Sequence, residues 1–335
     1  MTDPYEIDRA TFRPSVTQSI AELHITGGVR AIHEGDRHWS WFPVLTNKGA
    51  QQLKPMPIQQ VAGLANLVGL QLFGGDQQSG LEGPLVSRVW TPLDGPNSGG
   101  LQPADLWRAI AGNADRAGDA AYAGLARHIA YSLTAAGIRL RDASDAYNAQ
   151  LLAAIEGGRE SGSRFANIPM YDLELAFHSV FSELASARDY LAASLALKLG
   201  APPKIEAMNR FKEWISGASR THLRTGPVAS IMLAAYDPTS TDPWLYELTE
   251  YRNLFLHRQP LGSTMSPQML VYETVKHKGF LFPRITMPLD ASDPSAPGMD
   301  ALARFIQLYQ AMTRLVKLAA DYAAYDTSMP TFVVK

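Results

Sequence analysis

Residues 173–195 read LELAFHSVFSELASARDYLAASL, and this stretch decides the fold that the sequence predicts. Its apolar residues recur every three or four positions, which is the spacing of one face of an α-helix. This face consists of Leu173, Phe177, Val180, Leu184, Ala187, Leu191 and Leu195. Gly200 and the pair Pro202-Pro203 follow, and both residue types commonly end helices. The sequence therefore predicts a long amphipathic helix that needs partners for its apolar face.

Three more segments in the second half of the chain show helical spacing. The four predicted helices span residues 171–199, 204–217, 243–257 and 300–323. The third of them starts at Thr241-Asp242-Pro243, which supplies an N-cap and a proline in the first turn. Because each helix must bury its apolar face, a four-helix bundle is the simplest arrangement.

A β-hairpin is predicted between the third and fourth helices. Residues 269–275 and 280–285 form its two apolar runs, and Lys276-His277-Lys278-Gly279 forms the turn. The expected C-terminal domain is thus a helical bundle with a small β-hairpin insertion.

The first half of the chain is less regular. Residues 29–33 and 38–42 predict two short strands, residues 57–73 predict a helix, and residues 103–155 predict two or three alanine-rich helices. A glycine- and serine-rich linker at residues 157–163 follows. We therefore expect a mainly α protein with two domains, a mixed, mostly helical N-terminal region of unknown role at residues 1–165 and the bundle at residues 166–335.

Composition excludes several classes of function. The 335 residues include no cysteine, so disulfides and thiolate chemistry are excluded, and a cytoplasmic location is expected. The net charge of −2 is not that of a general nucleic-acid binder, and no apolar run is long enough for a membrane span. His33 and His38 stand one position too far apart for the helical zinc motif, so neither a metal nor another cofactor is expected.

The segment Arg252-Asn253-Leu254-Phe255-Leu256-His257 carries the clearest chemical pattern, at the end of the third predicted helix. Residues five positions apart lie roughly 140° apart around an ideal helix. For Arg252 and His257 to converge, the helix must loosen or end between them, and Pro260 and Gly262 favour an end nearby. The structural alternative is an arginine that pairs with Glu247 or Glu250 and a histidine that interacts with the helix dipole.

Arg252, Asn253 and His257, late in the third helix of a predicted bundle, resemble the Arg-x4–6-His motif of the HEPN superfamily. The resemblance covers roughly residues 166–330. It implies a metal-independent ribonuclease that acts as a homodimer with the two motifs facing each other. It also implies a role in toxin–antitoxin, phage-defence or RNA-processing systems, with an antitoxin or regulatory protein as a partner. Some HEPN domains lack catalysis and only bind RNA or protein.

The residue types suit RNA cleavage. Histidine titrates near neutral pH and can give or take a proton, and the arginine fork matches phosphate oxygens. A local excess of basic residues between positions 198 and 224 predicts phosphate contacts, with a solvated surface as the alternative. The RNA-binding candidates are Lys204, Arg210, Lys212, Arg220 and Arg224. Glu183 and Asp189, on the first bundle helix, are candidates to orient Arg252 or His257.

Two other functions remain open at this point. One is a HEPN-like module without catalysis that binds RNA or a partner protein. The other is a small-molecule-binding protein whose pocket lies in the N-terminal half.

Overall fold

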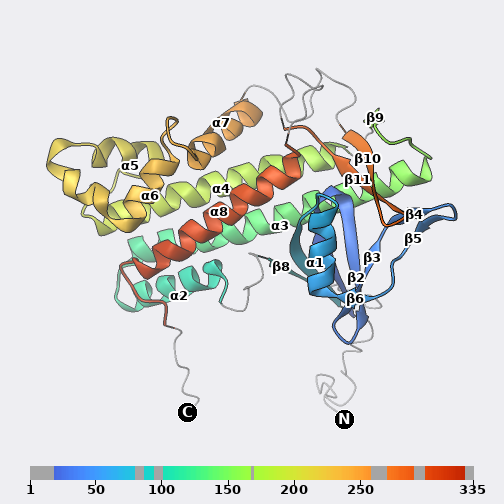
Figure 1. The fold of residues 1–335 in the computed structure, drawn as a ribbon. Helices are drawn as coiled ribbons and strands as arrows, with labels where there is room; N and C mark the ends of the chain where they lie inside the picture. The colour runs from blue at the N-terminus through green and yellow to red at the C-terminus, as the bar shows by residue number, and fades with distance from the viewer. Residues whose placement is uncertain are drawn as a thin grey trace, which may run out of the picture.

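Long helices lie side by side in this protein, and strands gather at one end of them (Figure 1). The structure is a computed structural model that describes residues 19–79, 87–93, 101–166, 170–257, 270–289 and 299–328. None of the helices in these ranges is long and apolar enough to cross a lipid bilayer.

The N-terminal residues form a six-stranded antiparallel sheet with the strand order β6-β3-β2-β1-β7-β8. Its strands are β1 (Ser19–Ile25), β2 (Val29–Gly35), β3 (His38–Phe42), β6 (Met56–Pro57), β7 (Leu72–Ser79) and β8 (Ser87–Pro92). The β2–β3 hairpin turns at Asp36 and Arg37, which both have positive φ, and it confirms the two strands predicted there. Helix α1 (Ile58–Leu67) packs against β3, β6 and β7.

A second antiparallel sheet has the order β5-β4-β11-β10-β9. Its strands are β4 (Val44–Thr46), β5 (Gly49–Gln51), β9 (Arg164–Phe165), β10 (Leu270–His277) and β11 (Phe280–Thr286). The predicted hairpin is confirmed as β10–β11, but short strands from the first half of the chain extend it on both edges. Trp41 of the first sheet and Phe282 of the second meet with ring centroids 5.7 Å apart, which joins the two sheets in one apolar core.

Four long helices form the main helical layer. They are α2 (Pro103–Arg116), α3 (Ala120–Glu156), α4 (Met170–Lys198) and α8 (Ala301–Asp321). The carboxylate of Asp119 caps α3 by accepting a hydrogen bond from the backbone N–H of Tyr122. Helix α3 runs for 37 residues without a break, and it packs against α2, α4 and α8 as well as the sheets. It is therefore the element that connects both halves of the chain.

Aromatic rings close the core between these helices. Phe177 of α4 lies 4.3 Å from Phe305 of α8, and Phe181 lies 4.5 Å from the same ring, measured between centroids. Tyr147 of α3 contacts Phe177 with its ring edge. Such edge-to-face pairs add specific geometry to apolar burial. The apolar face predicted for residues 173–195 thus packs against α3 and α8.

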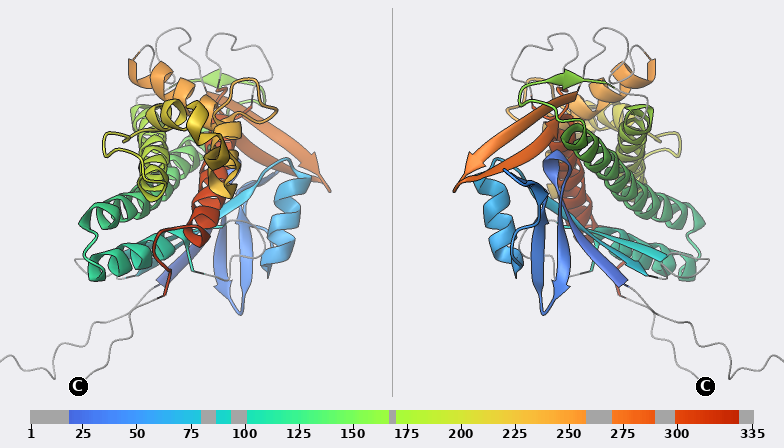
Figure 2. Two further views of the ribbon diagram at one scale, coloured as in Figure 1. Left: turned by 90° about the vertical axis from the view of Figure 1, so that its left-hand side faces the viewer. Right: turned by 90° about the vertical axis from the view of Figure 1, so that its right-hand side faces the viewer.

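Shorter elements cover the far part of α4. They are α5 (Met208–Ile215), the 3-10 segment η2 (Ala218–Thr225), α6 (Pro227–Ala235) and α7 (Trp244–His257). Helices α5 and α7 both contact α4, and α6 and α7 also contact α8. Figure 2 shows these helices on one side of the molecule and the sheets on the other.

The expected fold class, a mainly α protein with a C-terminal four-helix bundle and a mostly helical N-terminal region, is wrong. The N-terminal region is β-rich, and the hairpin belongs to a five-stranded sheet. The helix predicted at residues 57–73 ends at Leu67, because Gly69 adopts a positive φ of 72° and the chain then enters β7. The four predicted helices exist, but α3 is a major partner of α4 and α5 is only a short element at its end.

The junction between the first sheet and α3 depends on a glycine. The segment η1 (Thr26–Gly28) connects β1 to β2, and Gly28 has a φ of 83°. A Cβ atom on Gly28 would lie 2.5 Å from the carbonyl oxygen of Tyr147 in α3. The carbonyl of Gly28 accepts a hydrogen bond of 2.7 Å from the Asn148 side chain. Only glycine therefore allows the sheet to pack this closely on the helix backbone.

We predict that Gly28→Ala lowers the free energy of unfolding by about 3 kcal/mol or more, since the methyl group meets backbone atoms that cannot move aside. Urea unfolding measured by circular dichroism provides the test.

The matched control is Gly49→Ala. Gly49 has a similar φ of 93°, but nothing lies within 4 Å of the position of its Cβ. The free energy of unfolding of this variant should fall by only about 1–2 kcal/mol, which is the cost of a left-handed conformation for alanine. Equal losses in the two variants would show that the close contact with α3 does not matter.

Candidate functional site

Helix α7 places Arg252 and Asn253 on a rigid support. Three contacts fix this helix against its neighbours. Thr249 accepts a hydrogen bond from Arg188 of α4, and the Tyr251 ring lies 5.6 Å from the Phe181 ring, measured between centroids. Glu247, at the start of α7, forms an ion pair with Arg304 of α8. The turn that carries Arg252 is therefore held against the packed helices.

Arg252 itself is half-buried, as is Asn253. In the part of the chain that the structure describes, the Arg252 side chain makes no ion pair or hydrogen bond. Glu247, one of the two carboxylates that could have neutralised it, is bound to Arg304 instead. A half-buried guanidinium without a carboxylate partner is available to bind an anion.

His257 is the last residue of α7, and its side chain lies outside the described residues. The predicted end of the helix before Pro260 falls on residues outside those that the structure describes. The helix does not end between Arg252 and His257, however, so the two positions stay roughly 140° apart around the helix axis. Helical geometry alone does not bring the two residues to one face of α7.

The RNA-binding candidates lie mainly on α5 and η2, and α5 lies at the end of the molecule away from the sheets (Figure 1). Arg224 donates hydrogen bonds to the carbonyls of Ile215 and Ser216, and Arg220 donates to the carbonyl of Trp214. These two arginines therefore satisfy carbonyl groups at the end of α5.

The remaining basic candidates differ in their surroundings. The Lys212 ammonium lies 5.4 Å from the centroid of the Tyr236 ring. Arg210 pairs with Glu213 in an exposed ion pair, and Lys204 is exposed. Lys204, Arg210 and Lys212 thus remain the better candidates for contacts with a polyanion, since their charged groups are not used to cap a helix.

The two acidic candidates on α4 are both half-buried. Asp189 accepts hydrogen bonds from Arg188 Nε and from the backbone N–H of Met208, so it connects α4 to the start of α5. Glu183 makes no hydrogen bond or ion pair with the described residues. Neither carboxylate bonds to Arg252.

A buried polar network between the first sheet and α3 was not found by sequence reasoning. His24 Nδ1 lies 3.1 Å from Ser144 Oγ, and His24 Nε2 lies 3.8 Å from Asp76 Oδ2. Arg30 donates to Ser144 Oγ at 2.9 Å and pairs with Asp145 at 3.1 Å. Residue types alone gave no signal for it, because its members come from β1, β2, β7 and α3.

Serine, histidine and aspartate in this order resemble a hydrolase triad, but the surroundings exclude that chemistry. His24 and Ser144 are 0% exposed and Asp76 is 2% exposed, so no substrate reaches the hydroxyl. Burial, together with the charge of Arg30, lowers the pKa of His24 to about 4. His24 is therefore neutral at pH 7, and the network serves to hold β1 and β7 against α3.

No group of three or more His, Cys, Asp or Glu side chains within the described ranges is arranged to hold a metal ion. Comparison with known proteins gave no match to a family model, to a curated protein or to a solved structure. The functional argument therefore rests on the residues of this chain.

The buried His24 predicts a specific dependence of stability on pH. Its pKa is lower in the folded state than the ordinary value of 6.5, so the unfolded chain binds more protons between pH 4 and 6.5. The contribution of neutral His24 to the free energy of unfolding is therefore complete above pH 6.5, and it is lost as the pH falls toward 4. Relative to His24→Asn, which cannot titrate, the wild type should lose about 3 kcal/mol over this interval.

The measurement is the difference in urea-unfolding free energy between the two proteins at a series of pH values. Other titrating groups largely cancel in this difference. A difference that stays constant from pH 7 to pH 4 would contradict a buried, neutral His24.

Proposed function

We propose that this protein is a metal-independent endoribonuclease of the HEPN type, which cleaves single-stranded RNA with Arg252 and His257. The observation that carries the proposal is the half-buried Arg252 guanidinium, which no carboxylate in the described ranges neutralises. It lies five residues before His257 on a helix held by α4 and α8. The resemblance of Arg252, Asn253 and His257 to the HEPN motif suggests a role in a cytoplasmic toxin–antitoxin or phage-defence system, with an antitoxin or regulatory protein as partner.

The proposed reaction is an internal transfer of the phosphate. A base takes the proton of the ribose 2′-OH, the 2′ oxygen attacks the adjacent phosphorus, and the bond to the 5′ oxygen breaks. An acid returns a proton to the leaving 5′ oxygen, so the products are a 2′,3′-cyclic phosphate and a 5′-hydroxyl. Arg252 binds the phosphate oxygens and stabilises the extra negative charge of the transition state. His257 carries out a proton transfer.

A single His257 does not readily serve as base and acid in one step. Helical geometry also separates Arg252 from His257 within one chain. A homodimer with the two α7 ends facing each other would supply two histidines and two arginines to one composite site. We therefore propose that the active form is a homodimer in which the last turns of α7 face each other.

Light scattering should accordingly give a mass of about twice that of the 36.6 kDa chain at micromolar concentration. A monomer at high micromolar concentration would contradict the composite site.

The direct test of the proposed site is mutation of its two charged residues. His257→Ala should reduce the cleavage rate of a fluorescent single-stranded RNA by about 10²–10⁴-fold, the usual contribution of general acid–base catalysis. Arg252→Ala should reduce it by about 10²–10³-fold, since it removes electrostatic stabilisation of the transition state. Arg252→Lys should recover only part of the rate, because an ammonium group lacks the planar fork.

Two exposed residues provide matched controls. His128→Ala on α3 and Arg314→Ala on α8 remove the same side-chain types far from the end of α7, and both variants should cleave at the wild-type rate. EDTA should have no effect. If the site variants cleave as fast as the controls, the ribonuclease proposal fails. If RNA binds without being cut, the alternative of a non-catalytic RNA-binding module takes its place.

A further inference from the structure

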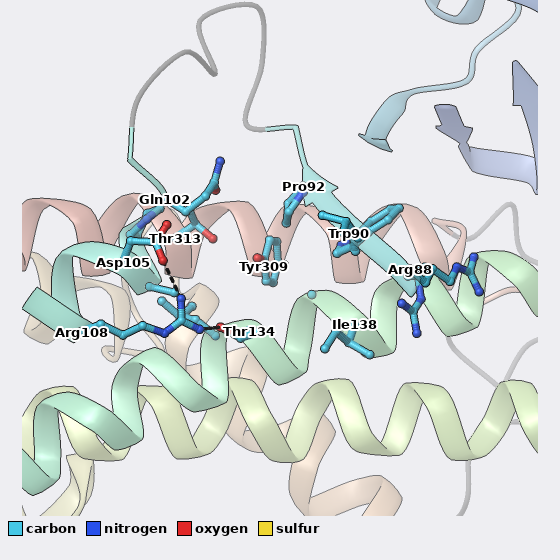
Figure 3. Close-up of a pocket in the computed structure, with 16 residues that line it drawn as sticks. Arg88, Trp90, Pro92, Gln102, Asp105, Arg108, Thr134, Ile138, Tyr309 and Thr313 are labelled. Carbon is cyan, nitrogen blue, oxygen red and sulfur yellow. Dashed lines mark hydrogen bonds and ion pairs between the residues drawn. The ribbon is translucent and has the colours of Figure 1, made fainter. Parts of the chain in front are cut away.

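An open pocket lies on the face of α3 that is turned toward β8 and α2, and α7 contributes nothing to it (Figure 3). Its walls come from α2, α3, α8 and β8, and its volume is about 350 Å³. This volume is within the range of small-molecule sites in proteins. We call it the Trp90 pocket, after the aromatic residue near its middle.

The middle of the Trp90 pocket combines flat apolar surface with unused hydrogen-bonding groups. Trp90, Pro92 and Tyr309 lie there between the two ends (Figure 3). The indole Nε1 of Trp90 and the hydroxyl of Thr313 are buried, and neither has a hydrogen-bond partner in the described ranges. Thr313 is only 4% exposed. Buried polar atoms without partners cost free energy, which a bound molecule with matching acceptors would recover.

The absence of a side chain at Gly137 lets Tyr309, Trp90 and Pro92 lie close to α3 in the pocket. Gly137 lies inside α3, where alanine would favour the helix by about 1 kcal/mol. A Cβ atom there would lie 3.0 Å from the Tyr309 hydroxyl oxygen and 3.5 Å from both Trp90 Nε1 and Pro92. Gly124, in the same helix, has nothing within 4 Å of the corresponding point. A side chain at Gly137 would therefore meet residues that line the pocket, and a Cβ atom at Gly124 would meet nothing.

Arginines occupy both ends of the pocket. Arg108 lies at one end, where Asp105 and Thr134 orient its guanidinium, and Arg88 lies at the other (Figure 3). Asp145 holds Arg88 through two hydrogen bonds of 2.8 and 3.1 Å, so its position is fixed before any ligand arrives. Arg141 also lines the pocket, and Asp105 is the one acidic residue among the described residues that line it. A guanidinium has five N–H groups, so each arginine retains donors for an anion.

We propose that the Trp90 pocket binds a flat aromatic molecule that carries one anionic group, a carboxylate or a phosphate. The ring system packs between Trp90, Pro92 and Tyr309, and ligand acceptors take the hydrogen bonds of the Trp90 N–H and the Thr313 hydroxyl. The anionic group binds at the Arg108 end. The site is separate from Arg252 and does not depend on the proposed ribonuclease activity.

The test compares two fluorescent probes that share one aromatic body. The first is 8-anilinonaphthalene-1-sulfonate, an anion, and the second is the neutral N-phenyl-1-naphthylamine. Fluorescence titration should show that Gly137→Val weakens binding of the anionic probe at least about tenfold, because the added side chain forces Tyr309, Trp90 and Pro92 to shift within the pocket. Gly124→Val, the matched control, should bind like the wild type. Urea unfolding checks that both variants are folded.

A second variant tests the charge at the Arg108 end. Arg108 is half-exposed, so Arg108→Gln should leave the fold intact. The variant should bind the anionic probe about tenfold more weakly and the neutral probe with an affinity within about twofold of the wild type, since only the anionic probe loses a charge-assisted hydrogen bond. Adenosine monophosphate and 1-naphthoate then compete for the anionic probe, and the better competitor identifies phosphate or carboxylate as the preferred group. The proposal is overturned if the anionic probe binds Gly137→Val as tightly as the wild type. It is also overturned if Arg108→Gln binds both probes with an equal loss of affinity, or if neither competitor displaces the anionic probe.

Discussion

The close packing of one helix, α3, against both a sheet and other helices is the constraint on which the rest of the structure depends. Small side chains make this possible, because Ala123, Ala126, Ala136 and Ala143 are fully buried along it. Gly28 lets the backbone of the first sheet approach the carbonyl of Tyr147 more closely than any other residue would allow. The network around His24 then gives hydrogen bonds to His24 Nδ1, Ser144 and Arg30, which this approach removes from water.

The sequence predicted the elements whose signals are local. Both hairpins have alternating apolar residues and a turn rich in glycine and charged residues, and the helices of the second half have clear apolar faces. The strands β1, β7 and β8 were missed, because β7 contains Gly74, Gly75 and polar residues, and its pairing with β1 spans some fifty residues of chain. Apolar spacing also shows that α4 has a buried face, but not that α3 packs against it.

The same limit applies to the candidate sites. The place of Arg252 on the last turns of a helix could be predicted, since helix-ending residues follow it. The pairing of Glu247 with Arg304 could not, because it joins residues far apart in the chain, and it is this pairing that leaves Arg252 without that carboxylate. Two of the five basic residues chosen for RNA binding, Arg220 and Arg224, donate hydrogen bonds to carbonyls near the end of α5. The Trp90 pocket combines residues from four elements and had no local signal at all.

Two regions with different chemistry therefore lie on different elements of one protein. Within the described residues, the end of α7 offers an arginine without a carboxylate partner, five positions before a histidine, and these residue types suit chemistry on a phosphate. The pocket beside α3 offers oriented arginines around a flat apolar surface, which suits binding of a small anion. Because the two regions share no residues, each can be tested without disturbing the other.

The central functional claim is that a ribose 2′-OH attacks the adjacent phosphate at the Arg252 and His257 site. Its most direct test is cleavage of a single-stranded RNA compared with the same RNA carrying one 2′-deoxynucleotide at the cleaved position. The account predicts cleavage of the first, with a 2′,3′-cyclic phosphate end identified by mass spectrometry, and no cleavage at the substituted position of the second. Cleavage at the 2′-deoxynucleotide, or no cleavage of either RNA, would contradict it.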